Sequence, residues 1–191
     1  MSEPQQKTMK KIKTITLKKT TGKKTIAQSN DVFTGCIDSD FKNYGTDKKD
    51  KTTEEIKAEV YEIEKDGTFE GIFGEFLVND LNSLCLTQEQ IINFCKEYKD
   101  LLSSWYTFFL FKVDGEFFVA DVYVVDGGLK VDALRFSDGS VWSADLQRRV
   151  VVPQLKTLKL SSDPLKLGHS ETLENAIKIC KENGYQVSKI M

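Results

Sequence analysis

Histidine, proline and long hydrophobic runs are scarce in this chain, and each scarcity excludes a class of protein. The 191 residues include one histidine and three prolines. The single histidine, His169, excludes most zinc enzymes and leaves one candidate for any histidine-centred triad. The longest apolar run, around Thr107–Phe111, is far shorter than the ~20 residues of a membrane-spanning helix. Because no apolar stretch follows the N-terminal lysines, no secretory signal is predicted either.

Paired cysteines are also missing. The four cysteines are scattered, with no C-x-x-C and no spacing typical of a metal site: Cys36, Cys85, Cys95 and Cys180. A composition of 40% hydrophobic and 29% charged residues is typical of one domain with a sizeable core, which does not need disulfides. We therefore expect reduced, buried thiols and a cytoplasmic location.

Sequence motifs of phosphate binding and hydrolysis are absent. The chain has no G-x-x-x-x-G-K-[ST], G-x-G-x-x-G, H-E-x-x-H or G-x-S-x-G. The segment Thr21-Gly22-Lys23-Lys24 lacks the first glycine of a phosphate-binding loop. These absences favour a protein that is not an enzyme and that needs no cofactor.

Positive charge is concentrated near the N-terminus. Eight lysines fall between positions 7 and 24 without an acidic residue among them, and the chain from Thr25 onward holds 19 basic and 28 acidic residues. A basic arm favours non-specific contact with a polyanion through Lys7–Lys24, but it has no arginine or aromatic residue for specific readout. Thr14–Leu17 alternates in a β-prone pattern that can extend a sheet edge. We expect the Lys7–Lys24 arm to be dispensable for folding.

The clearest helix signal begins at Thr87. Thr87-Gln88-Glu89-Gln90 is a capping box, and apolar residues then recur every three or four positions up to Leu102. Residues 28–53 read instead as an irregular wrap whose apolar side chains reach the core at intervals. Residues 55–64 predict a strand with a bulge, and residues 68–84 a short helical turn and loop.

Three Asp-Gly pairs, at 114, 126 and 138, predict a four-stranded antiparallel β-meander. Asp-Gly suits both left-handed positions of a type I′ turn. The strands are expected at 105–113, 116–125, 128–137 and 140–147, with one more at 149–152 that Pro153 ends. The resulting register makes one face apolar across all four strands, and the Thr87 helix should pack on it. The opposite face is mixed, and the wrap or a C-terminal helix is expected to cover its apolar half.

The same register places three aspartates in a row on the mixed face. Asp121 is expected opposite Asp132, and Asp132 opposite Asp145. Because directly opposed like charges destabilise a sheet, the row needs a reason. A divalent cation is one such reason, since carboxylate oxygens are the ligands of hard ions. Repulsion screened by solvent, with Lys130 nearby, is the simpler alternative.

The sequence therefore predicts an α+β fold in three parts. These are the basic arm of residues 1–30, a core domain of residues 31–155 with the β-meander and its packed helix, and a C-terminal linker, helix and short strand over residues 156–191. Ser170 is the expected N-cap of the last helix, and Gly184 its end.

Four stretches within residues 31–155 carry a resemblance. They are the segments at 31–47 (DVFTGCIDSDFKNYGTD), 84–92 (LCLTQEQII), 107–120 and 149–155 (RVVVPQL). The chain resembles a family of uncharacterised hypothetical proteins of environmental bacteria. The resemblance implies a recurrent domain and carries no activity, cofactor or site residue.

Two functional hypotheses follow from the sequence. The first is a non-enzymatic binding or regulatory module that uses the mixed sheet face or the basic arm; its partner would be another protein, a second copy or a polyanion, and not a membrane. The second is a divalent-metal-binding domain or metal-dependent hydrolase built on Asp121, Asp132 and Asp145. The absence of typical catalytic constellations favours the first.

Overall fold

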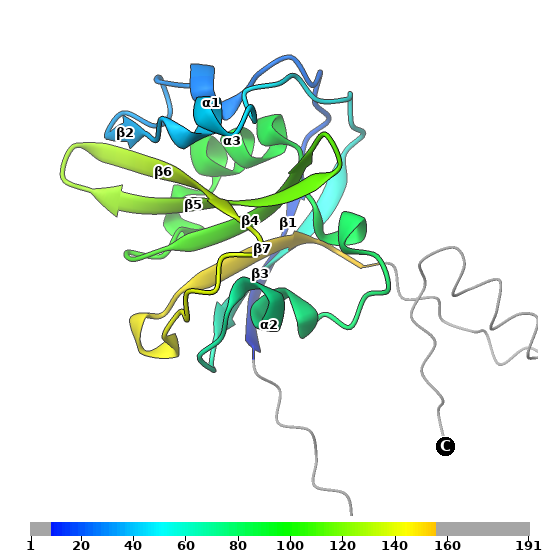
Figure 1. The fold of residues 1–191 in the computed structure, drawn as a ribbon, viewed down its shortest axis with the longest axis vertical. Helices are drawn as coiled ribbons and strands as arrows, with labels where there is room; N and C mark the ends of the chain where they lie inside the picture. Colours follow the sequence, from blue (N-terminus) through cyan, green and yellow to red (C-terminus); the bar gives the residue numbers. More distant parts are fainter. Residues whose placement is uncertain (1–8, 156–191) are drawn as a thin grey trace, which may run out of the picture.

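The computed structural model describes residues 9–155, which form an α+β fold around one seven-stranded mixed sheet (Figure 1). The strand order is β1-β3-β7-β4-β5-β6-β2. The strands are β1 (Met9–Leu17), β2 (Cys36–Ile37), β3 (Ile56–Ile63), β4 (Thr107–Val113), β5 (Glu116–Val125), β6 (Gly128–Arg135) and β7 (Arg149–Pro153). The helices are α1 (Asp40–Asn43), α2 (Phe69–Gly74) and α3 (Gln88–Glu97), with 3-10 turns η1 (Ile26–Gln28), η2 (Leu81–Leu84), η3 (Lys99–Leu101) and η4 (Ala144–Leu146). The expected C-terminal helix and strand lie outside the described residues.

The first two Asp-Gly turns join hairpins with the predicted register. Phe109 lies opposite Ala120, and Val122 opposite Val131. At the first turn both Asp114 and Gly115 have positive φ, at 50° and 90°, as a type I′ turn requires. At the second turn only the glycine of the pair has positive φ, so this hairpin reaches the same register without a type I′ turn.

The prediction for the third turn is wrong, and the sheet is mixed rather than a pure antiparallel meander. Residues 140–147 do not pair with β6. The neighbour of β6 is β2, which runs parallel to it, and β7 lies parallel to β4 in the middle of the sheet. The physical reason lies in Val150–Val152, which are buried on both faces of the sheet. A continuous apolar run of this kind suits a central strand better than an edge, so residues 136–148 carry the chain across to that position.

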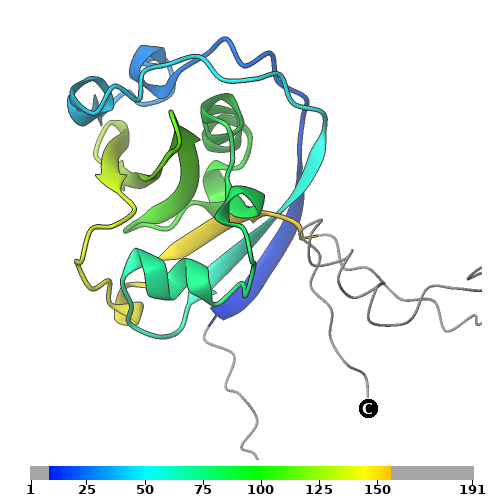
Figure 2. The same cartoon turned by 45° about the vertical axis from the view of Figure 1, so that its right-hand side comes forward.

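One face of the sheet, here the α3 face, is apolar as predicted and packs against α3 (Figure 2). Phe94 of α3 meets Phe109 of β4 edge to face, with ring centroids 5.1 Å apart. The predicted capping box is present, since Gln90 N donates to the Thr87 hydroxyl and Thr87 N donates to Gln90 Oε1. These contacts fix where α3 begins and which side of it faces the sheet.

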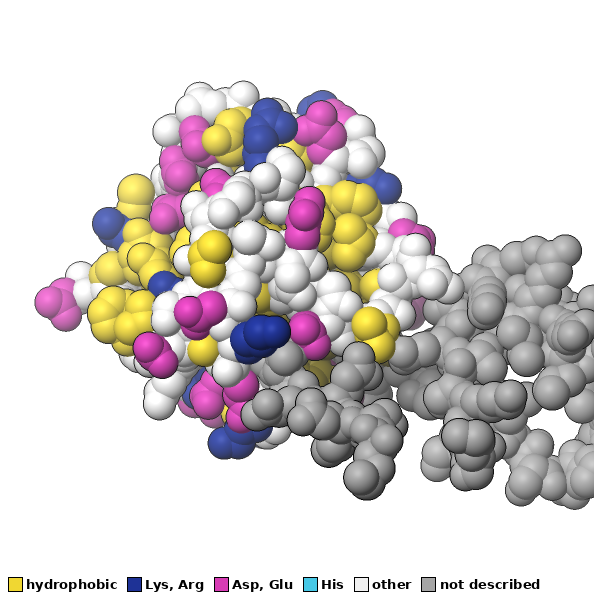
Figure 3. Space-filling view, turned by 60° about the horizontal axis from the view of Figure 1, so that its bottom comes forward, with side chains coloured by type: hydrophobic (Ala, Val, Ile, Leu, Met, Phe, Trp, Pro, Cys, Tyr) yellow, Lys and Arg dark blue, Asp and Glu magenta, His cyan; other side chains and the backbone are white. Residues whose placement is uncertain are grey.

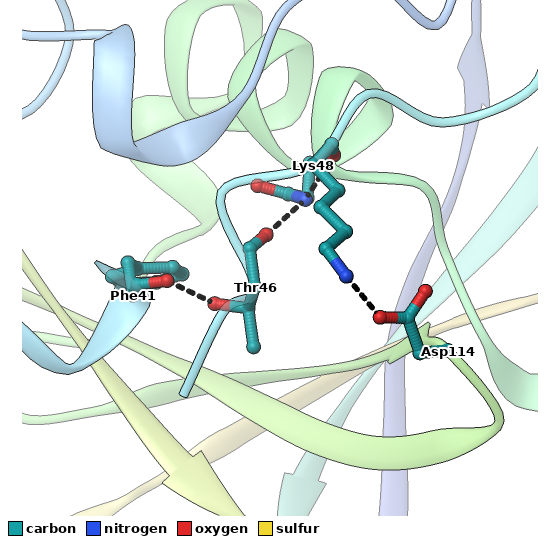
Figure 4. Close-up of polar contacts among 5 residues, drawn as sticks. Phe41, Thr46, Lys48 and Asp114 are labelled. Atoms are coloured by element: carbon teal, nitrogen blue, oxygen red, sulfur yellow. Dashed lines mark hydrogen bonds and ion pairs between the residues drawn. The ribbon is translucent and has the colours of Figure 1, made fainter. Parts of the chain in front are cut away.

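Buried Gln88 ties the wrap to the start of α3. Its Nε2 donates to the carbonyls of Thr46 and Lys48 at 2.8 and 3.0 Å. The Thr46 hydroxyl donates to the Phe41 carbonyl, and Lys48 pairs with Asp114 at the first hairpin (Figure 4). The expectation of an irregular segment that reaches the core at intervals is confirmed, with Phe41 fully buried among the residues that cover the α3 face.

Residues 9–30, expected to be part of an arm, are built into this folded unit. Strand β1 pairs with β3 along its length, with a bulge between Lys11 and Lys13. Its side chains Ile15 and Leu17 are buried in the same core as α3. Glu89 of α3 then accepts hydrogen bonds from the backbone N–H groups of Thr21 and Lys23, which holds the following turn in place.

The opposite face, here the α2 face, is covered by α2 and η2. Phe69 and Phe73 of α2 are fully buried against β4 and β7 side chains such as Phe108 and Val152. The wrap lies on the other side of the sheet, so the expectation that it covers this face is wrong.

Among residues 9–155, no helix is long and apolar enough to cross a membrane.

Candidate functional site

The structure brings together two of the three aspartates of the predicted row. Asp121 of β5 and Asp132 of β6 are direct partners in the antiparallel ladder. Asp145 lies in η4, exposed, where its backbone N–H is bonded to the Ser143 hydroxyl. It is excluded from the row because residues 140–147 leave the sheet instead of pairing with β6.

A different aspartate takes the third place. β2 runs beside β6 with Ile37 opposite Val131, and the Asp38 backbone N–H donates to the Val131 carbonyl. Asp38 therefore follows in register next to Asp132, and its charge raises the pKa of that carboxyl. Sequence reasoning missed this neighbour because a two-residue parallel strand, far away in the chain, leaves no periodic signal.

Asp121 is the buried member of this group, with a side chain 2% exposed. Burial raises its pKa well above the ordinary value, the charge of Asp132 raises it further, and Arg148 acts against the rise. For Asp132, which is half-buried, burial and the charge of Asp38 raise the pKa, while the Tyr123 hydroxyl bond and Lys130 lower it. The pair thus favours holding a proton over carrying two charges.

Aromatic side chains pack beside the two carboxylates. The Tyr106 ring lies 5.0 Å from that of Tyr123 and 5.8 Å from that of Trp142, edge to face in both cases. The guanidinium of Arg148 lies over Tyr106 and Trp142, 5.4 and 5.3 Å from their ring centres, in cation–π geometry. Burial and Asp132 raise the pKa of the Tyr123 hydroxyl to about 12, so it stays protonated.

Three buried polar atoms of this site have no hydrogen-bond partner in the described part of the chain. They are Asp121 Oδ1, Trp142 Nε1 and Arg148 Nε. Buried polar atoms without a partner are uncommon in folded proteins. A hydrogen bond also forms within the segment that supplies Trp142 and Arg148, where the Arg148 guanidinium donates to the Ser143 carbonyl.

Large apolar side chains are also exposed at this end of the sheet, with Val124 on the α3 face rather than beside Tyr123, because neighbouring residues of a strand point to opposite faces. Trp105 is 51%, Val124 47% and Val141 68% exposed, and each directly precedes or follows one of the three packed aromatic residues in the chain. In Figure 3, hydrophobic side chains gather at the left, where β4 begins and the β5–β6 hairpin turns. We call this surface the sheet end and define it by Trp105, Tyr106, Tyr123, Val124, Val141 and Trp142.

The structure does not gather the three carboxylates of the predicted row, since Asp145 lies in η4. Within residues 9–155 no three or more His, Cys, Asp and Glu side chains are grouped so that they can hold one ion. Arg148 also places a positive charge near Asp121, which opposes a cation there. A hollow of about 110 Å³ lies elsewhere, between Met9, Ile63 and Ile72 beside α2.

The sequence did not predict that most residues of the sheet end lie together. The sequence predicts Trp105 at the start of a strand at 105–113 and Trp142 within a strand at 140–147, and it does not bring them together with Arg148. The aromatic residues and Arg148 come together only because residues 136–148 cross the α2 face on the way to β7. Comparisons of this chain with protein-family models, with curated proteins and with solved structures find no match. The resemblance drawn from the sequence stays a prediction.

Proposed function

We propose that this protein is a non-enzymatic binding module and that the sheet end is its recognition surface for a protein partner. One observation carries the proposal: three of the four large apolar side chains exposed in residues 9–155 belong to residues next in the chain to the packed rings of Tyr106, Tyr123 and Trp142, at one end of the sheet. Interface centres are enriched in Trp, Tyr and Arg held in well-packed surroundings. Asp121, Trp142 and Arg148, which each have a buried polar atom without a partner in residues 9–155, lie in the same part of the molecule.

Chemistry at Asp121 and Asp132 is supported less well. A catalytic acid must touch its substrate, and Asp121 is almost fully covered. The alternative of a divalent-metal domain or hydrolase loses Asp145 from its ligand set and gains a neighbouring Arg148. Thermal melting with magnesium, manganese or calcium tests this alternative, because a real site raises the melting temperature by mass action.

A reducing, cytoplasmic location fits the binding module. Within residues 9–155, Cys36, Cys85 and Cys95 are free thiols. Burial raises the pKa of Cys85 to about 12 and also raises that of fully buried Cys95, so neither forms the reactive thiolate.

Peptide display against the immobilised full chain tests the recognition surface. Peptides that bind wild type should lose affinity by about tenfold or more on Trp105→Ala, as expected for an interface tryptophan. Leu77→Ala is the matched control, since Leu77 is 64% exposed in the loop after α2. Peptides indifferent to Trp105→Ala and Val124→Ser, or a selection that yields no binder, would contradict the proposal. A second copy as partner is recognised separately, as a concentration-dependent dimer that Trp105→Ala dissolves.

A further inference from the structure

The two edge strands of the sheet differ in length. One ends in β2, which is only two residues long, and the other in β1, which is nine residues long. Short edge strands and covered edges prevent unwanted pairing, whereas a long edge presents a row of backbone N–H and C=O groups. Among residues 9–155 no strand pairs with the outer side of β1, and only the Thr16 carbonyl is taken, by the Tyr98 hydroxyl.

Lysine is the charged residue of this edge. Lys10, Lys11 and Lys13 are exposed along β1, and no acidic residue occurs in the strand or in the turn that follows. Such lysines, together with a bulge, keep two copies of an edge apart by repulsion. The same charges attract a strand of opposite sign.

Carboxylates pair with one lysine of β1 and with one in the turn that follows it. Lys11 pairs with the Glu59 carboxylate of β3, and Lys18 donates to Glu97 of α3 at 2.8 Å. Strand β1 has no arginine that could bind a phosphate through two hydrogen bonds and no aromatic side chain on which a base could stack. A peptide strand, by contrast, satisfies the open backbone groups as well as the charges.

We propose that β1 accepts an acidic extended peptide segment as an eighth strand of the sheet, next to Met9–Ile15. Backbone hydrogen bonds provide the geometry, and carboxylates at alternate positions of the peptide meet the exposed lysines. This surface is separate from the sheet end, so the protein has two independent contact sites.

Fluorescence anisotropy with a labelled peptide of alternating glutamate and valine tests this proposal on the full chain at low salt. We expect saturable binding that weakens by about threefold or more in the Lys10→Gln/Lys13→Gln double variant, since two exposed charge pairs are lost. Lys42→Gln/Lys130→Gln is the matched control, because it removes the same charge from α1 and β6, at the opposite edge of the sheet from β1, and should bind as wild type does.

Two further probes separate strand addition from simple charge attraction. A peptide of equal charge with proline in place of valine cannot donate along a ladder and should bind much more weakly. Amide hydrogen exchange should slow within Met9–Ile15 when the first peptide is bound. Equal binding of the proline peptide or of a single-stranded oligonucleotide of equal charge, unchanged exchange in β1, or no binding at all would overturn the proposal.

Discussion

Asp121 is a buried side chain whose ionisation is unfavourable in the folded protein. Its carboxyl is covered on the α2 face, faces Asp132 directly and makes no hydrogen bond through Oδ1 within residues 9–155. Arg148 offsets only part of this cost, because the pKa of Asp121 remains well above its ordinary value. Protonation of the Asp121 carboxyl therefore stabilises the folded chain.

The pH dependence follows from the direction of this shift. The folded pKa lies above the unfolded value of about 3.9, so the folded state holds the extra proton between the two values. Stability is therefore fully present at acidic pH and decreases as the pH rises through the folded pKa. The Asp121→Asn variant carries no charge at this position. We therefore expect its free energy of unfolding at neutral pH to exceed that of wild type by about 1 kcal/mol or more. Urea unfolding across pH 4 to about 8 measures the effect.

Asp126→Asn is the matched control for that measurement. Asp126 lies on the same hairpin but is exposed at the turn, and its replacement should leave the pH dependence of wild type unchanged. A steep loss of stability with rising pH that persists in Asp121→Asn would assign the effect to Asp132 or another group instead.

Phe109 tests the packing between β4 and α3. Its side chain is fully buried and meets Phe94, so Phe109→Ala should lower the free energy of unfolding by roughly 3–5 kcal/mol. Chemical denaturation of the purified variant gives this value directly. A loss under about 1 kcal/mol is incompatible with the register and burial described here.

At the scale of elements, the local pairings were predictable and the distant ones were not. The hairpins β4–β5 and β5–β6 follow from Asp-Gly turns and alternating side chains, and α3 follows from its capping box. The positions of β1, β2 and β7 depend on strands far away in the sequence. The candidate site inherits this division: Asp121 and Asp132 were paired correctly, whereas Asp38, Trp142 and Arg148 reach it through distant connections.

Strand β1 is expected to be required for folding, contrary to the expectation from composition. Deleting residues 1–19 removes Ile15 and Leu17 from the core and exposes the edge of β3. We expect the shortened protein to lose its cooperative thermal transition, followed by circular dichroism. Lys10→Gln/Lys13→Gln should change stability by no more than about 0.5 kcal/mol, since both side chains are exposed. A shortened protein that melts like wild type would show that the strand is an accessory.

Strand β7 contributes side chains to both cores, one on each face of the sheet. Val151 lies in the core under α3 and Val150 in the core under α2, so one strand belongs to both layers. We expect residues 9–155 to unfold as one unit, with coincident urea transitions by far-UV circular dichroism and by fluorescence of Trp105 and Trp142. Val151→Ala should move both transitions to lower urea together. Separate midpoints for the two probes would show that the layers unfold independently.

The central position of β7 also sets the order in which a new chain can fold. Strands β3 and β4 leave the ribosome well before residues 149–153, yet each needs β7 as its neighbour. Until that strand arrives, the β1–β3 pair and the β4–β5–β6 hairpins each carry an open, apolar inner edge. Closing contacts between residues so far apart in the sequence is slow, and open edges invite pairing with other chains. We therefore expect a newly made chain to be most prone to pairing with other chains in the interval before β7 inserts.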